Sequence, residues 1–140
     1  MCMQNEMDIG KCAGYFHDGS LINIEHIQSS VVLSIESAEI SMDENPDEIV
    51  LSEASTIKGK LHLEGVDSIT ENEQQTSDCL KMLHDSACIL HLKVHNATVY
   101  LDLEWVNFPP HPRVTAYSFY VIHAKKIWWE NIPDLFDPFW

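Results

Sequence analysis

The sequence predicts an all-β fold: a single antiparallel β-sandwich, or a flattened barrel, of seven to eight strands built from hairpins, with little helix. Segments in which apolar and polar residues alternate with period two recur along the chain, and short turn sequences separate them. No segment shows a long apolar period of 3.6 residues, the pattern of an amphipathic helix. With 140 residues, 45% of them hydrophobic, the chain has the size and composition of one domain with one core.

The first predicted hairpin lies within residues 16–40. Its turn is expected at Gln28-Ser29, and moving the turn to Ser29-Ser30 would keep the same residues on the inner face. The pairs expected to face each other on that side are Ile22 with Ile35, Ile24 with Leu33, and His26 with Val31.

The segment from Ile89 to Trp105 predicts a second hairpin, because it alternates on both sides of Asn96-Ala97. Asn tolerates the positive φ that a type I′ turn needs at its first position, whereas Ala is a poor substitute for Gly at the second. The expected inner pairs are Val94 with Val99, Leu92 with Leu101, and Leu90 with Leu103; the outer pairs are His95 with Thr98, Lys93 with Tyr100, and His91 with Asp102. A shift of one residue would expose the leucines, so the pattern specifies the register strongly.

The two hairpins resemble each other, since each follows a His-Asp pair and their inner positions match with one inserted residue. In this alignment Ile22 corresponds to Leu90. A duplicated half would explain the likeness, but any two alternating hairpins look alike.

Two further segments, Thr56–Val66 and Arg113–Ala124, also predict strands, the second because it is rich in β-branched and aromatic residues. Weaker strand signals lie near 49–51 and 79–83. The predicted linkers are 41–48, 70–78 and 108–112. None of them marks a domain boundary, so we expect one domain over residues 1–140.

The N-terminal residues 1–14 are expected to form a loose arm. They include acidic residues and no apolar run of seven or more, so neither a signal peptide nor a membrane span is predicted there. The four cysteines, Cys2, Cys12, Cys79 and Cys88, form no CxxC pair. Free thiols in a reducing compartment are therefore expected, with a disulfide pair as the alternative, and the predicted location is cytoplasmic.

His17-Asp18 and His84-Asp85 each precede a predicted hairpin. Asp18-Gly19 is a turn dipeptide, and an Asp carboxylate in a turn can accept hydrogen bonds from backbone N–H groups. We therefore expect both pairs to shape turns, with a catalytic or ligand role as the alternative.

The histidines do not predict a metal site. His91 and His95 share one face of a strand, but residues four apart on a strand are roughly 13 Å apart, too far for one zinc ion. The sequence has no nucleophile elbow, no phosphate-binding glycine loop and no EF-hand spacing in its acidic run. No catalytic residue, metal ligand or cofactor is therefore predicted.

The charge balance is extreme, with 22 Asp and Glu against 8 Lys and Arg and a net charge of −14. Nucleic acids and anionic membranes need basic surfaces, so neither is expected as a partner. A basic protein surface would complement the charge, although high charge also serves solubility alone. The residues expected to contact such a partner in the acidic run are Asp43, Glu44, Asp47 and Glu48.

The C-terminal residues 126–140 form an aromatic tail that is expected to pack on the core. Five large aromatic residues stand within the last thirteen positions, among them Trp128 and Trp140. The alternative is that the tail meets a partner, because Trp is a favoured anchor in interfaces. Trp128 and Trp140 are therefore candidate partner-binding residues.

At Phe16-His17-Asp18-Gly19 the sequence resembles small bacterial proteins of uncharacterised function that begin with an aromatic-His-Asp-Gly pattern ahead of alternating strands. Some of those proteins look like immunity proteins of polymorphic toxin systems. The resemblance covers about the first 25 residues and implies a non-enzymatic inhibitor or binding module.

The sequence thus predicts a non-enzymatic, acidic protein-binding module, of immunity or inhibitor type, for a basic partner. The alternative is a β-sandwich that binds a small ligand or metal, with weak hydrolase-like chemistry near His17 and Asp18.

Overall fold

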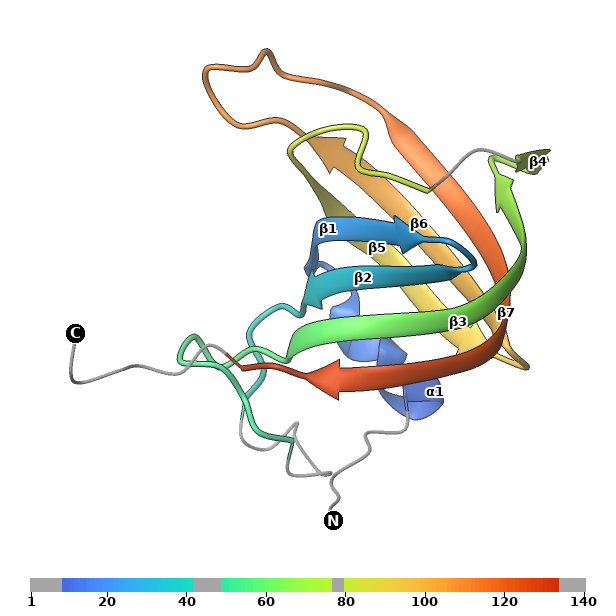
Figure 1. Ribbon diagram of the computed structural model, residues 1–140. Coiled ribbons are helices and arrows are strands. Elements are labelled where there is room, and N and C mark those ends of the chain that lie inside the picture. The colour runs from blue at the N-terminus through green and yellow to red at the C-terminus, as the bar shows by residue number, and fades with distance from the viewer. Residues whose placement is uncertain (1–8, 42–48, 77–79, 134–140) are drawn as a thin grey trace.

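A computed structural model describes residues 9–41, 49–76 and 80–133 as a closed antiparallel barrel with a short helical segment at its N-terminal end (Figure 1). The helical elements are α1 (Ile9–Cys12) and the 3₁₀ turn η1 (Ala13–Phe16). The strands are β1 (Ser20–Ile27), β2 (Ser30–Glu36), β3 (Lys58–Glu71), β4 (Gln74–Thr76), β5 (Ser86–His95), β6 (Thr98–Val106) and β7 (Tyr117–Asn131).

The strands lie in the order β2-β1-β5-β6-β7-β3-β4, and an additional pairing of β2 with β3 closes the sheet on itself. Strands β1, β2, β3, β5, β6 and β7 form the closed ring, and β4 extends it beyond β3. The predicted all-β, antiparallel class is confirmed. Of the two predicted architectures, the structure has the barrel and does not show the sandwich.

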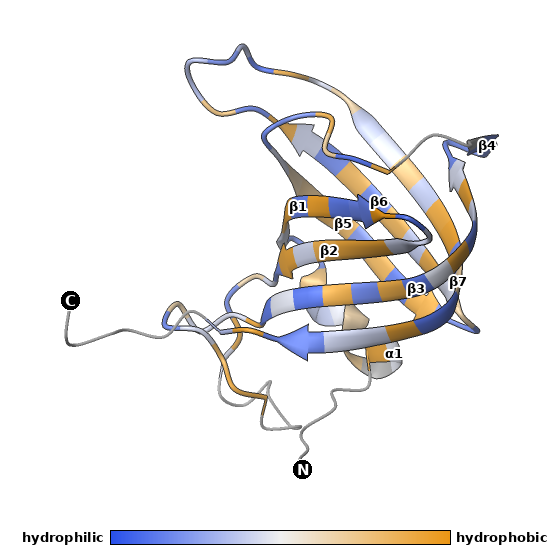
Figure 2. Ribbon diagram, viewed as in Figure 1, coloured by the Kyte–Doolittle hydropathy of each residue, from blue (hydrophilic) through white to orange (hydrophobic). Residues whose placement is uncertain are grey.

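The core fills the inside of this ring. Figure 2 shows apolar and polar residues alternating along the strands, as the period-two pattern predicted. Leu33, Leu61, Leu63, Leu101 and Leu103 are fully buried on the inner side. The alternation places the intervening residues on the outer surface of the barrel.

The first hairpin has its turn at Gln28-Ser29, and the expected pairs His26–Val31 and Ile24–Leu33 are confirmed. The third expected pair is wrong. The register shifts between Leu21 and Asn23, so Leu21 faces Ile35 and Ile22 is left 41% exposed.

The second hairpin has the predicted Asn96-Ala97 turn, with φ of 50° and 59° at its two residues. The expected pairs from His95–Thr98 to His91–Asp102 are confirmed. The pair of Leu90 with Leu103 is wrong, because a register shift between Ile89 and His91 places Ile89 opposite Leu103.

The two register shifts occur at Ile22 and Leu90, the positions that correspond in the alignment of the two hairpins. They lie next to the contact of β1 with β5, where Ser20 pairs with Cys88 and Leu21 pairs with Ala87. A bulge increases the local twist of a strand, which a small closed barrel requires. Strict period-two alternation could not predict an inserted residue.

The loose N-terminal arm expected over residues 1–14 is wrong from Ile9 onward; residues 1–8 lie outside the described ranges. Ile9, Cys12, Ala13 and Phe16 are buried in short helical turns that lie against β5. The Phe16 ring lies 5.3 Å from the ring of Trp129. These four side chains follow a helical spacing over two turns only, too short a stretch to give a periodic signal.

Strand β7 includes part of the predicted strand Arg113–Ala124 and continues through the first residues of the predicted aromatic tail. Trp129 is buried in the core, as expected for a packed tail, whereas residues 134–140 lie outside the described ranges.

The weak strand signals at 49–51 and 79–83 are wrong over their described residues, because neither 49–51 nor 80–83 is a strand. The second lies beside β1, where the Leu80 N–H donates a hydrogen bond to Nδ1 of His26 at 2.9 Å. Beyond Leu21, β1 has this loop as its neighbour in place of β5. The loop supplies apolar side chains, including buried Leu80, but not the ladder of a strand.

Cys88 is a free thiol, as predicted, and Cys12 is buried; Cys2 and Cys79 lie outside the described ranges. Across the part of the chain that the structure describes, neither helical element has the length and apolar character needed to cross a bilayer.

The register of the second hairpin can be tested at two adjacent positions. Leu101 is fully buried and Asp102 lies on the outer face. We expect Leu101→Asp to lower the free energy of unfolding by several kcal/mol, because it buries a charge, and Asp102→Asn to change it by less than about 1 kcal/mol. Urea unfolding of both variants measures this difference. Equal losses would show that the faces are wrongly assigned.

Candidate functional site

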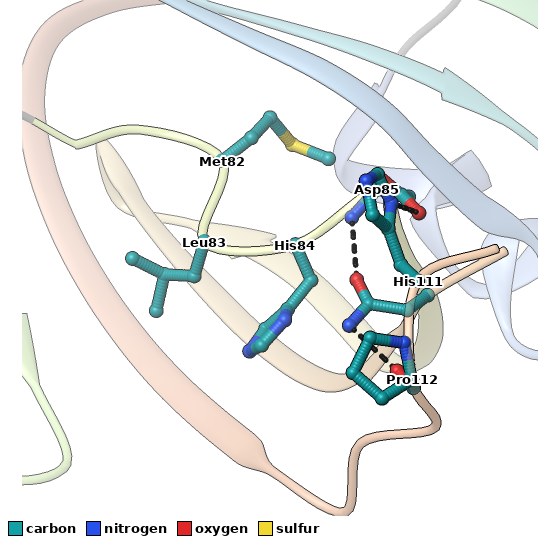
Figure 3. A pocket seen from close by; sticks show the side chains of 7 residues that line it. Met82, Leu83, His84, Asp85, His111 and Pro112 are labelled. Carbon is teal, nitrogen blue, oxygen red and sulfur yellow. Dashed lines mark hydrogen bonds and ion pairs between the residues drawn. The ribbon is translucent and has the colours of Figure 1, made fainter. Parts of the chain in front are cut away.

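The second His-Asp pair lines an open depression of about 360 Å³ at the end of the barrel where β5 begins and β6 ends (Figure 3). Two loops form it: the stretch before β5 and the stretch after β6. The lining residues are Met82, Leu83, His84, Asp85, Asn107, His111 and Pro112. His84 and Asp85 were candidates from the sequence alone, whereas the proximity of His111 was not predicted.

Asp85 holds the two loops together. Its carboxylate accepts a hydrogen bond from Nδ1 of His111 at 2.8 Å and another from the Phe108 N–H at 2.8 Å. Its own N–H donates to the side chain of Asn107, whose amide donates in turn to the Pro112 carbonyl. These bonds anchor a tight turn in which the His111 N–H donates to the Phe108 carbonyl at 2.9 Å.

The His111 hydrogen bond, followed by the bond from the Phe108 N–H, lowers the pKa of Asp85 below its usual value. Both donors stabilise the ionised carboxylate more than the neutral acid. Asp85 therefore acts as a charged clamp, which agrees with the expected turn-shaping role of this pair.

The same geometry leaves Nε2 of His111 facing solvent, since Nδ1 is bonded to Asp85 and the side chain is 62% exposed. An imidazole oriented by a carboxylate can act as a general base. Among the described lining residues, however, there is no Ser, Thr or Cys to serve as a nucleophile. His84 packs its ring against Trp105, with 5.9 Å between the ring centroids, so it covers the end of the core.

The first His-Asp pair lies in a surface turn. Asp18 has φ of 67°, its N–H donates to the Ile89 carbonyl at 2.8 Å, and the Gly19 N–H closes the turn onto the Phe16 carbonyl. Nδ1 of His17 donates to the Leu90 carbonyl at 2.5 Å. The two side chains are 63% and 70% exposed and lie 3.7 Å apart. The recorded bonds tie this turn to β5 and support the turn-shaping role.

The remaining histidines do not gather into a site within the described ranges. His91 and His95 lie on the outer side of β5, with Asp102 paired opposite His91, as predicted. In the part of the chain that the structure describes, no group of three His, Cys, Asp or Glu side chains could hold a metal ion.

Of the residues expected to bind a partner, Asp43, Glu44, Asp47, Glu48 and Trp140 lie outside the described ranges. Trp128 lies on the outer face of β7 and is half-buried. Its ring stacks on His62 with centroids 4.0 Å apart and planes within 5° of parallel. Its indole N–H donates to the carboxylate of Glu64 at 2.6 Å.

A second surface joins carboxylates and aromatic rings on neighbouring strands. We call Tyr100, Asp102, Glu104, Tyr117 and Phe119 the β6–β7 outer face. Asp102 pairs with Phe119 and Glu104 pairs with Tyr117, while the intervening Leu101 and Leu103 point into the core. The Tyr117 hydroxyl donates to the Glu104 carboxylate at 3.4 Å, and Tyr117 is 56% exposed.

The negative potential of this face acts on a neighbouring thiol. Burial and, after it, the charges of Asp18 and Glu104 raise the pKa of the Cys88 thiol, which lies on β5 beside Glu104. The first His-Asp turn thus adds its carboxylate to the same region. Lys93 is a nearby cation, with its ammonium 5.9 Å from the centre of the Tyr100 ring. The sequence predicted the pairs of Tyr100 and Asp102 with β5, but it predicted neither the pairing of β6 with β7 nor this surface.

Compared with known proteins, the chain matches no family model, no curated protein and no solved structure. The geometry and electrostatics of its surfaces therefore provide the indications of its function.

The Asp85 clamp predicts a pH dependence. The lowered pKa of Asp85 means that the clamp is fully formed above the ordinary Asp range and is lost as the pH falls through the folded-state pKa. We expect the protection factor of the Phe108 amide in hydrogen exchange to be high at pH 6 and to fall below pH 4. Asp85→Asn should reduce protection at pH 6 and remove this dependence. Asp18→Asn, in the other His-Asp pair, serves as the control and should leave the Phe108 amide unchanged. Persistence of the dependence in Asp85→Asn would contradict the clamp.

Proposed function

We propose that the chain is a non-enzymatic protein-binding module, of inhibitor or immunity type, whose β6–β7 outer face binds a basic surface of a partner protein. The observation that carries the proposal is the pairing of Asp102 with Phe119 and of Glu104 with Tyr117 on neighbouring strands. Carboxylates beside aromatic rings suit arginine and lysine side chains, which bind both by charge and by contact with the ring.

The rigidity of the surface favours such binding. The five side chains stand on β6 and β7, which lie side by side within the closed ring, so little backbone entropy is lost when a partner docks. Tyr is a favoured interface anchor, and Tyr117 is exposed at the end of the strand. Exposed Phe108, in the loop that Asp85 holds, lies at the same end of the barrel.

The overall charge supports a basic partner. A chain with 22 acidic and 8 basic residues attracts a cationic protein over a long distance. Asp43, Glu44, Asp47 and Glu48 would contribute to that long-range attraction, whereas direct contacts are assigned to the β6–β7 outer face. We expect the attraction to act mainly on the association rate.

A second candidate function, binding of a small ligand with hydrolase-like chemistry, was expected near His17 and Asp18. The observation that favours it lies instead at the other pair, where His111 is oriented by Asp85 beside a depression. If this candidate were correct, His111→Ala would abolish hydrolysis of an activated ester such as p-nitrophenyl acetate, while His17→Ala would leave it intact. We expect neither variant to change the background rate.

The partner surface predicts a salt-dependent association rate. The immobilised chain is used to capture proteins from its native cytosol, and each captured protein is tested for binding kinetics at 0.01 M and 0.1 M salt. Because the Debye length falls from about 30 Å to about 10 Å between these conditions, association should slow markedly while dissociation changes little.

Two matched double variants locate the surface. Asp102→Lys with Glu104→Lys should slow association at least about tenfold, and Tyr117→Ala should mainly speed dissociation. Glu53→Lys with Asp67→Lys makes the same change in net charge at exposed positions away from this face. This control variant should therefore slow association less than Asp102→Lys with Glu104→Lys does. A neutral or acidic partner, or equal effects of the two double variants, would overturn the proposal.

A further inference from the structure

Strand β7 is longer than its neighbour β6, so among the described residues part of one edge of β7 has no strand beside it. Up to His123, β7 pairs with β6 on one side and with β3 on the other. The Ala124 N–H still donates to the Ala97 carbonyl in the β5–β6 turn. From Lys126 to Asn131, β3 is the only strand paired with β7 among the described residues. Figure 1 shows this half of β7 beside β3; the helical segment α1–η1 lies mainly against β5, and the ring of its Phe16 contacts the ring of Trp129.

The hydrogen bonds of β7 indicate which backbone groups face that edge. The Ile132 N–H donates to the Lys58 carbonyl at 2.8 Å, so this pair is of the hydrogen-bonded type. Pairs two residues apart in an antiparallel ladder are of the same type, which directs the backbone groups of Trp128 and Glu130 toward β3. The N–H and C=O groups of Ile127 and Trp129 then point to the unpaired edge.

This edge is complementary to itself. If a second copy pairs antiparallel with it about a two-fold axis at Trp128, Lys126 of each copy stands opposite Glu130 of the other. Ile127 stands opposite Trp129, and the two Trp128 side chains meet on the axis. Lys126, Trp128 and Glu130 share the outer face, so two opposite-charge pairs flank a central aromatic pair. The groups of Ile127 and Trp129 supply the hydrogen bonds of the ladder.

The side chain of Trp128 already has a fixed orientation in the single chain. His62 on β3 covers one face of its ring and Glu64 accepts its indole N–H, so the ring has little freedom to lose on association. Because β3 lies on the covered side, the opposite face of the ring is turned toward the unpaired edge.

We propose that this edge of β7 binds a second copy of the chain, forming a two-fold symmetric dimer with a sheet continuous across both barrels. The occupant is a second copy because Lys126, Trp128 and Glu130 complement the same three residues in reverse order. Lysines on exposed edge strands can also prevent pairing with another chain. If Lys126 had that role, the chain would stay monomeric. The proposed dimer leaves the β6–β7 outer face free, so it is independent of the proposed function.

Charge reversal tests the register. Sedimentation equilibrium of the full chain over roughly 1–100 µM gives the dimer dissociation constant, with each variant checked for folding by circular dichroism. We expect Lys126→Glu and Glu130→Lys each to raise this constant by about tenfold or more, because each change creates two like-charge pairs. The double variant carrying both changes restores the opposite-charge pairs and should return to within about threefold of the original value.

Two controls make the test specific. Lys125→Glu makes the same charge change one residue away, outside the Lys126–Glu130 pairs. It should raise the dimer dissociation constant much less than Lys126→Glu does. Hydrogen exchange of the Ile127 and Trp129 amides should slow as the protein concentration rises through the dissociation constant, which also tests the proposal if Glu130→Lys does not fold.

A chain that stays monomeric throughout this concentration range would overturn the proposal. So would a dimer that responds equally to Lys125→Glu and Lys126→Glu, a double variant that fails to recover, or exchange at Ile127 and Trp129 that is independent of concentration.

Discussion

The pairing of β2 with β3 closes the sheet, and the other features of the structure depend on that closure. Val31 stands opposite Leu63 and Leu33 opposite Leu61, so the same contacts that join the ring also fill its interior. Closure removes most of the open edges that an antiparallel sheet would otherwise expose. It also requires strands that twist strongly and approach closely. Gly59 permits this, because a Cβ at that position would overlap the carbonyl oxygen of Glu130 on β7.

Because the strands of the closed ring differ in length, some strand segments at both ends of the barrel lack a paired neighbour on one side among the described residues. At one end β1 and β5 separate after Leu21, and the loop from Leu80 to Asp85 fills the space between them. The depression beside His111 is a consequence of this loop meeting the one after β6. At the other end β7 extends beyond β6, so half of its length has a strand on one side only among the described residues.

The two His-Asp pairs show how a common local sequence acquires different surroundings. His17 and Asp18 form a surface turn that is bonded to the main chain of β5. Asp85 instead meets a loop that begins about 20 residues later in the chain, and it receives hydrogen bonds from Phe108 and His111. A carboxylate clamp of this kind depends on a contact between distant segments. The local sequence around His84 and Asp85 does not distinguish this pair from the pair of His17 and Asp18.

Local side-chain alternation determined much of the fold. The class, both hairpin turns and the pairs from His95–Thr98 to His91–Asp102 could be predicted, because a one-residue slip would expose a whole apolar face. Among the candidate functional residues, alternation also placed Asp102 on an outer surface.

The tertiary structure decided what depends on closure and on long-range contact. The bulges at Ile22 and Leu90 accommodate the twist of the closed ring. Phe16 is buried because it packs against Trp129, which is distant in the sequence. Neighbouring residues in the chain predict neither feature. The position of His111 beside Asp85, and the edge at Trp128 that no described strand other than β3 pairs with, could likewise not be predicted from the sequence. Both arise from where separate segments end relative to one another, and that is set by packing in three dimensions.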